Sequence, residues 1–166
     1  MATRVPRRAR GIDRGSRGVT PDQRRLRDAL AAVPERVAAT IEASSRPPDD
    51  APAPGEWSAR QVVLHLAAVE EEVWQARLDA LASEAFPHWP WVEPGLWAGP
   101  GGDTWDGALA AFAACRAATV ARLDALDADG WRRTGRHATY GILDVAALLR
   151  ILLAHDEEHL AQIATG

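Results

Sequence analysis

Two histidines near the carboxyl end of the chain, His155 and His159, have the spacing of a metal-binding pair on a helix. Residues four apart on a helix lie on one face about one turn apart, so their imidazole rings can share a cation. Both fall in the centre of an apolar stripe formed by Leu148, Leu152 and Ile163. Because burying an imidazole without a hydrogen-bond partner is costly, this placement favours a metal site over a chance spacing in a helix rich in Ala and Leu.

A third histidine, His65, occupies the centre of the apolar stripe of an earlier segment. Three neutral imidazole nitrogens from two helices can bind a divalent cation and leave positions open for water or substrate, as in catalytic sites. The spacing alone leaves an alternative open, in which His65 is a core residue bonded to a carbonyl or carboxylate. The single cysteine, Cys115, excludes an internal disulfide and a cysteine-rich zinc site, and its spacing indicates a small buried residue.

Four amphipathic helices are expected to position these histidines, because apolar residues recur at spacings of three and four in four segments. The helix starts carry residues that cap an N-terminus: Thr20, Ser58, Asp103 or Thr104, and Asp144. Pro34 should kink or break the first helix, the second should extend to about Ser83, and residues 127–130 should end the third. No segment shows the period-two alternation of a strand. The pattern predicts an all-α fold, an antiparallel four-helix bundle of the up-and-down type.

Charge is unevenly distributed along the 166 residues, whose net charge is −4. Residues 1–18 contain six arginines and one aspartate, a local charge of +5, and almost nothing that could be buried. We therefore predict a disordered Arg-rich tail over residues 1–18 and a helical domain over residues 19–166. A tether to nucleic acid or anionic lipid is the alternative role for the tail. The acidic balance of the whole chain is not that of a nucleic-acid-binding protein, so no nucleic-acid partner is expected.

No apolar run approaches the roughly 20 residues needed to cross a bilayer, and no apolar segment follows the basic amino terminus as in a signal peptide. We therefore expect a cytoplasmic protein without a membrane partner. The segment from Phe86 to Gly102 is rich in Trp, Pro and Gly and has two interpretations. It either covers one end of the bundle, or forms the wall of a substrate pocket or a homodimer contact.

Motifs in four segments resemble those of the DinB-like (YfiT-like) superfamily of four-helix metalloproteins. They are Trp57-Ser58, Val-Leu-His-Leu at 63–66, Tyr140-Gly141, and the segment 152–163 with the pattern His-Asp-x-x-His-x-x-Gln from His155 to Gln162. The resemblance covers about residues 20–165. It implies a divalent metal cation, variously zinc, nickel, iron or manganese, bound by His65, His155 and His159.

The resemblance also implies a class of activity. Some members of this family look like transferases or isomerases that use a low-molecular-weight thiol such as mycothiol or bacillithiol, and many have no established reaction. We therefore expect a metal-dependent enzyme of the thiol-dependent S-transferase type, acting on a small-molecule substrate. Its cation would act as a Lewis acid on a bound thiol or water. The alternatives are a metal-dependent hydrolase and a non-catalytic stress-response protein that binds a metal or small molecule.

Several polar residues are candidates to support the site. Asp156 is the carboxylate nearest to the histidines on the last helix, and it could hold a ligand histidine or act as a base. Its alternative interpretation is a solvated acid on the flank of the bundle. Gln162, on the other flank, could orient a ligand or a bound water. The run at 70–72 is interpreted as a charged face, and His137 is a weaker candidate ligand.

A cluster of arginines follows the third expected helix, at Arg132, Arg133 and Arg136. It could bind an anionic substrate, because guanidinium groups pair well with carboxylates. The alternative is a solvated loop.

Overall fold

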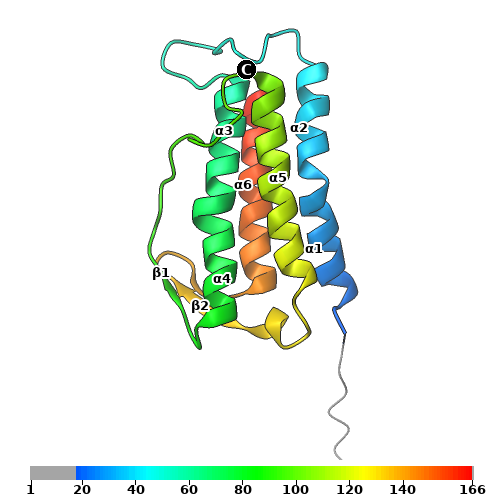
Figure 1. Cartoon of the computed structure of the whole chain (residues 1–166), viewed down its shortest axis with the longest axis vertical. Coiled ribbons are helices and arrows are strands. Elements are labelled where there is room, and N and C mark those ends of the chain that lie inside the picture. Colours follow the sequence, from blue (N-terminus) through cyan, green and yellow to red (C-terminus); the bar gives the residue numbers. More distant parts are fainter. Residues whose placement is uncertain (1–17, 166) are drawn as a thin grey trace, which may run out of the picture.

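The computed structural model describes residues 18–165, which form four long helical segments packed side by side with a small sheet at one end (Figure 1). The helical elements are α1 (Pro21–Ala31), α2 (Val33–Glu42), α3 (Ala59–Val69), the π-helix η1 (Glu70–Gln75), α4 (Ala76–Ser83), α5 (Trp105–Asp124), the 3₁₀ turn η2 (Gly130–Arg132) and α6 (Val145–Thr165). The strands are β1 (His88–Trp89), β2 (Thr134–His137) and β3 (Gly141–Asp144). The predicted tail lies outside the described residues, apart from Gly18. Within the described range, none of the helices is long and apolar enough to span a membrane.

The capping residues identified in the sequence begin the helices as predicted. Thr20 and Ser58 each form a capping box with the glutamine three residues later. The hydroxyl oxygen of the cap residue accepts the backbone N–H of the glutamine, and the glutamine side chain accepts the backbone N–H of the cap residue. Thr104 caps α5, and the Asp144 carboxylate accepts a backbone N–H of the first turn of α6 over 2.8 Å. These bonds satisfy amides that the first helical turn leaves without partners. The four-helix architecture is confirmed.

Pro34 divides the first helical segment into α1 and α2, as predicted. Because proline has no backbone N–H, the carbonyl of Leu30, four residues earlier, loses its helical partner. A side chain from another helix replaces that partner: Arg116 on α5 donates from Nη1 to the Leu30 oxygen over 3.2 Å. The interruption therefore creates a polar acceptor inside the bundle, and α5 supplies its donor.

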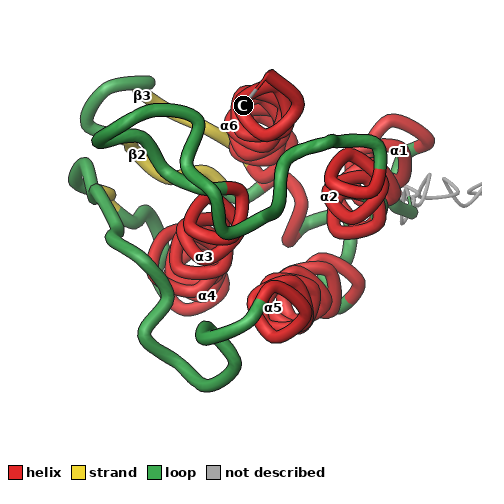
Figure 2. Tube along the Cα trace, turned by 90° about the horizontal axis from the view of Figure 1, so that it is seen from above, coloured by secondary structure: helices red, strands yellow, loops and turns green. Residues whose placement is uncertain are grey.

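The connections between the helices differ from those of an up-and-down bundle (Figures 1 and 2). The segment α3–α4 runs in the same direction as α5: Arg60 near the start of α3 donates to the carbonyl of Gly102 just before α5, and Arg122 near the end of α5 pairs with Asp79 on α4. Residues 84–104 form a crossover that returns the chain along the bundle (Figure 1). An extended chain covers the roughly 30 Å of a 20-residue helix with about 9 residues, so this segment is long enough.

A three-stranded sheet in the order β1-β2-β3 lies at the end of the bundle where α4 stops (Figure 1). β1, from the crossover, pairs parallel with β2, and β2 pairs antiparallel with β3 as a hairpin. The periodicity of the sequence does not reveal this sheet, because strands of two to four residues are too short to show a period-two pattern. Gly135 in β2 allows Trp89 to pack on the backbone, since a Cβ there would lie 2.5 Å from the indole ring.

The core consists of two hydrophobic clusters with a polar layer between them. The cluster near the sheet includes Trp131 and Leu152, and the cluster toward the opposite end includes Phe112 and Ile163. Three buried charged side chains from different segments form the layer between the clusters: Glu70, Arg116 and Asp156.

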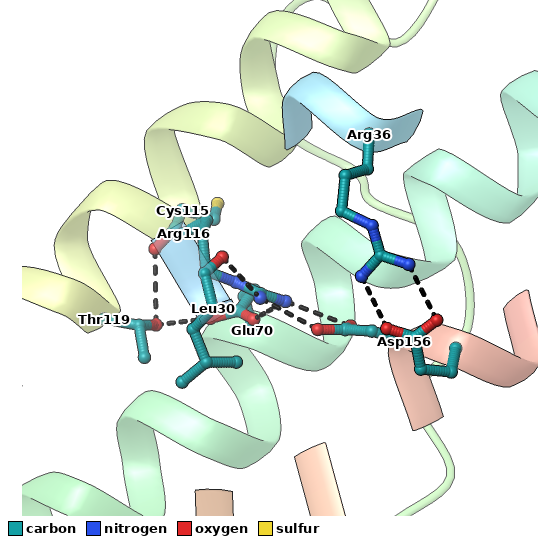
Figure 3. A network of polar contacts seen from close by, with 8 residues as sticks. Leu30, Arg36, Glu70, Cys115, Arg116, Thr119 and Asp156 are labelled. Atoms are coloured by element: carbon teal, nitrogen blue, oxygen red, sulfur yellow. Dashed lines mark hydrogen bonds and ion pairs between the residues drawn. The ribbon is translucent and has the colours of Figure 1, made fainter. Parts of the chain in front are cut away.

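In this layer, Arg116 lies between the two carboxylates (Figure 3). Its two Nη atoms donate to the two oxygens of Asp156 over 2.8 and 3.0 Å, and Nη2 lies 2.6 Å from Oε1 of Glu70. The Thr119 hydroxyl donates to the other oxygen of Glu70. All three charged side chains are at most 2% exposed. Burial raises the pKa of Glu70, and the nearby positive charge of Arg116 opposes this effect.

The buried position of Glu70 corrects the interpretation of residues 70–72 as a charged face, which holds only for Glu71 and Glu72. Glu70 begins the π-helix η1. A π-turn holds one residue more than an α-turn, so it rotates the side chains that follow relative to a regular helix. On α5 the buried position in the layer is Arg116 and not its neighbour Cys115, which is only partly buried.

Replacing Arg116 by Met should destabilise the protein by about 3–5 kcal/mol, because two buried carboxylates then lack a counter-charge. The matched control is Arg122→Met on the same helix. It removes an ion pair with the exposed Asp79 and should cost less than about 1 kcal/mol. Urea unfolding followed by circular dichroism measures both free energies. Equal losses in the two variants would contradict an organising role for the layer.

Candidate metal centre

The structure brings His65, His155 and His159 together between α3 and α6. One ring nitrogen of each lies within 4.8 Å of those of the other two. The ring centroid of His65 lies 5.7 Å from that of His155 and 5.1 Å from that of His159. The ring centroids of His155 and His159 on α6 are 4.5 Å apart. His65 is buried and the other two are partly buried. Three imidazoles from distant segments therefore meet at one point, which is the condition that the proposed metal site requires.

The crossover holds His65 in position. Its Nδ1 lies 3.2 Å from the carbonyl oxygen of Gly95, to which it donates, and Trp57 packs on the ring with a centroid distance of 4.9 Å. The Trp97 N–H donates to the carbonyl of Leu64 over 3.0 Å and anchors the same segment on α3. Because Nδ1 carries the proton, the lone pair on Nε2 is free for a cation. Burial lowers the pKa of His65, which favours this neutral form.

His159 is oriented by Gln162, one turn further along α6. Its Nδ1 lies 2.9 Å from Oε1 of the glutamine, the support that the sequence spacing suggested. This bond again leaves Nε2 as the free nitrogen, and that atom lies 3.2 Å from Nε2 of His155. The Nδ1 atom of His155 is buried and has no hydrogen-bond partner among the described residues.

The donor set fits a divalent cation. The Nε2 atoms of His155 and His159 lie 3.2 Å apart, a separation at which they share either a proton or a cation. Two nitrogens at about 2.1 Å from one tetrahedral ion are roughly 3.4 Å apart, so the observed separation suits shared coordination. Imidazole is a ligand for zinc, nickel, iron and copper alike, so these donors do not select the metal.

The environment keeps His155 neutral. Burial is the main effect that lowers its pKa to about 4, followed by the charges of His159, His65 and Arg116. A neutral imidazole is the form that binds metals. At neutral pH, His155 is therefore ready to act as a ligand.

Asp156 faces away from the histidines. Both of its oxygens bind Arg116 in the polar layer, and its side chain is 1% exposed. The alternative of a solvated acid, like the exposed Glu157 and Glu158, is therefore wrong. Asp156 therefore does not orient a candidate ligand. Among the described residues, Gln162 has this role, because its side chain accepts the hydrogen bond of His159.

The other polar candidates have different surroundings. His137 is buried in β2 and lies outside the histidine cluster. Two of the three loop arginines have partners of their own: Arg132 pairs with Asp129, and Arg133 donates to the carbonyl of Leu81 at the end of α4. Arg133 therefore connects this loop to the end of α4, and Arg132 forms only an exposed local pair, in line with the alternative of a solvated loop. Cys115 was predicted to be a buried residue but is only partly buried, and burial raises the pKa of its thiol.

A cavity of about 510 Å³ opens beside the cluster and is lined by His65 and His155. Residues Trp91 to Pro94 of the crossover form part of its wall. Of the two interpretations of the segment from Phe86 to Gly102, the structure therefore supports that of a pocket wall. The volume lies within the range of small-molecule binding sites.

The chain belongs to the DinB superfamily, whose family model matches residues 22–163. Its structure is similar to that of YfiT from Bacillus subtilis, which is described as a probable metal-dependent hydrolase with an unusual four-helix bundle topology. The two superpose with a TM-score of 0.66 at 21% sequence identity, over 98% of this chain and 90% of YfiT. At this identity the similarity shows the fold alone. No curated protein sequence matches the chain significantly.

The low pKa of His155 predicts that the metal-free protein loses stability in mild acid. The unfolded imidazole titrates near 6.5 and the folded one at about 4. The unfolded state therefore binds more protons between these values, and stability falls as the pH decreases from about 6.5 to 4. The loss from this group should be at most about 3 kcal/mol, and less because the ring is only partly buried.

This prediction is measured by urea unfolding in chelator, comparing wild type with His155→Gln at several pH values. The difference in unfolding free energy between the two proteins should shift against the wild type as the pH falls. Parallel pH profiles would show that His155 does not titrate in this way.

Replacing Gln162 by Met should weaken metal binding about 10- to 100-fold, because the His159 ring then loses the bond that fixes its orientation. The control is Glu157→Gln on the same helix, an exposed residue that pairs with Arg36 and should leave affinity unchanged. Competition with a chromogenic chelator measures both affinities. Equal affinity in wild type and Gln162→Met would remove Gln162 from the site.

Proposed function

We propose that this protein is a metal-dependent enzyme in which His65, His155 and His159 bind one divalent cation beside a small-molecule cavity. The observation that carries the proposal is the convergence of three imidazole nitrogens within 4.8 Å, with two of these histidines in the cavity wall. Three protein ligands are typical of catalytic metal sites, because they leave a position for a substrate atom.

The residues around the cluster prepare it for this role. Gly95 and Gln162 orient two of the rings, and burial favours the neutral form of His65 and His155. A bound divalent cation supplies Lewis acidity that lowers the pKa of a coordinated thiol or water. The cavity wall holds the electrophilic substrate next to that nucleophile and excludes bulk solvent from one side.

The reaction that we propose first is transfer to a low-molecular-weight thiol. The thiol sulfur forms a bond to an electrophilic carbon of the substrate, the leaving group departs with the electron pair, and the thiol proton is released. A cavity of about 510 Å³ has room for organic groups of both reactants, which water attack does not require. The second candidate is hydrolysis, which the description of YfiT as a probable metal-dependent hydrolase favours.

Elemental analysis tests the metal site directly. Purified wild type should contain about one equivalent of a divalent metal, and the His155→Ala/His159→Ala variant should contain almost none, because two of three ligands are lost. His88→Ala is the control, since this exposed histidine lies outside the cluster and should not change the metal content. Equal metal in the double variant and the wild type would refute the ligand assignment.

Paired assays on metal-loaded protein distinguish the reactions. One follows the consumption of mycothiol or bacillithiol with an electrophilic substrate, and the other follows the hydrolysis of activated esters and amides. Activity in the first assay that disappears in the double variant supports the transferase, and activity in the second alone supports the hydrolase. Full metal occupancy without turnover in either assay supports the non-catalytic binding protein instead.

A further inference from the structure

The cavity contains a buried arginine that the metal site does not use. Arg77, in α4, is 6% exposed and lines the cavity. Its guanidinium stacks over the Trp74 ring at 5.1 Å from the centroid. Within residues 18–165 it forms neither a hydrogen bond nor an ion pair, in contrast to the buried Arg116 with its two carboxylates. The guanidinium nitrogens keep access to solvent in the cavity and have no acceptor among the described residues, so an anion that enters the cavity can pair with them.

A second donor in the same cavity also lacks an acceptor. His137 is 1% exposed and lines the cavity. Its Nδ1 accepts the backbone N–H groups of Thr139 and Tyr140 over 3.0 and 3.3 Å, so the proton of the neutral ring is on Nε2. That Nε2 atom is buried and has no partner among the described residues. Arg77 lies close enough to lower the pKa of His137, after the larger effect of burial.

The charges in the cavity wall differ between its two ends. Glu93 lies near His65, where its charge weakly opposes the lowering of the pKa by burial, and Glu158 adjoins the metal-ligand pair on α6. Arg77 follows His65 by 12 residues along α3, η1 and α4, so it lies about three helical turns closer to the sheet. Apolar side chains of η1 and α6, among them Val73 and Ile151, line the cavity as well. The cavity therefore suits a molecule with an acid group at one end and an apolar body.

We propose that Arg77 and the Nε2–H of His137 form a binding site for the carboxylate of a small organic acid whose apolar body lies in the cavity. A carboxylate accepts two hydrogen bonds from a guanidinium and a further one from an imidazole N–H. That this acid is the substrate rests on the proposed function. The binding itself requires no metal.

The test uses metal-free protein in chelator, so that a carboxylate cannot bind through a cation. The probes are benzoate, 3-phenylpropionate and hexanoate, each compared with its neutral alcohol, and inorganic phosphate. Calorimetry or the fluorescence of Trp74 and Trp91, both in the cavity wall, measures affinity. At least one carboxylate should bind wild type at least tenfold more tightly than its alcohol and more tightly than phosphate.

Variants then locate the anion. Arg77→Met, which keeps an apolar stem over Trp74, should weaken the carboxylate at least tenfold, and His137→Gln should weaken it by a smaller factor. Arg150→Gln is the matched control, because this arginine also lines the cavity but already pairs with Asp22 over 2.7 Å. It should change affinity less than twofold. Circular dichroism checks that each variant is folded, and the comparison of carboxylate with alcohol in wild type tests the proposal without any variant.

Three results would overturn the proposal: no carboxylate binds better than its alcohol, phosphate binds more tightly than every carboxylate, or Arg77→Met and His137→Gln, both folded, bind like wild type. The His155→Ala/His159→Ala variant separates this failure from failure of the metal site. It should lose metal yet keep carboxylate binding. If the double variant instead loses carboxylate binding, while Arg77→Met keeps both metal and carboxylate binding, the anion lies at the histidines and the proposal is wrong.

Discussion

The ion pairs of Arg116 and its hydrogen bond to a backbone carbonyl connect every helical segment of the bundle at one level. The guanidinium binds Asp156 on α6, Glu70 on η1 and the Leu30 carbonyl at the break between α1 and α2. A buried cation with two buried anions is not in itself a strong source of stability, because all three groups lose hydration. It does impose a strict geometric condition. Any rotation of one helix would leave a charge in the core without its partner.

This condition fixes the orientation of the metal ligands. Asp156 lies between His155 and His159 in the sequence, so its attachment to Arg116 turns the two histidines to another side of α6, toward α3 and the cavity. A rotation by one residue, about 100° around the helix, would bury the histidines and expose the aspartate. On the facing segment, Glu70 follows His65 by five residues and its carboxylate pairs with Arg116 in the same layer. The same polar layer therefore sets both helices that carry the site.

The sequence was sufficient for features that depend on local patterns. Capping residues such as Thr20 and Ser58 determine helix starts, and the four-residue spacing places His155 and His159 on one face. Features that depend on the third dimension were missed. Glu70 lies in a run of three glutamates whose type indicates solvent, and Arg116 is an ordinary surface residue by type. Both are buried here because oppositely charged groups from distant segments meet in the core. The direction of α5 depends on the crossover, whose Trp, Pro and Gly composition indicates irregular structure but not its path.

That crossover links the topology of the bundle to its chemistry. In an up-and-down bundle a short loop would join the second and third helices and would leave the groove between α3 and α6 open to solvent. The parallel arrangement instead requires residues 84–104 to pass along the bundle (Figure 1). On the way they supply the Gly95 carbonyl that orients His65, the wall from Trp91 to Pro94, and the strand β1 that pairs with the segment carrying His137. The connection that periodicity does not predict is thus the one that encloses, in one cavity, the histidine cluster and the two donors, Arg77 and His137 Nε2, that have no acceptor within residues 18–165.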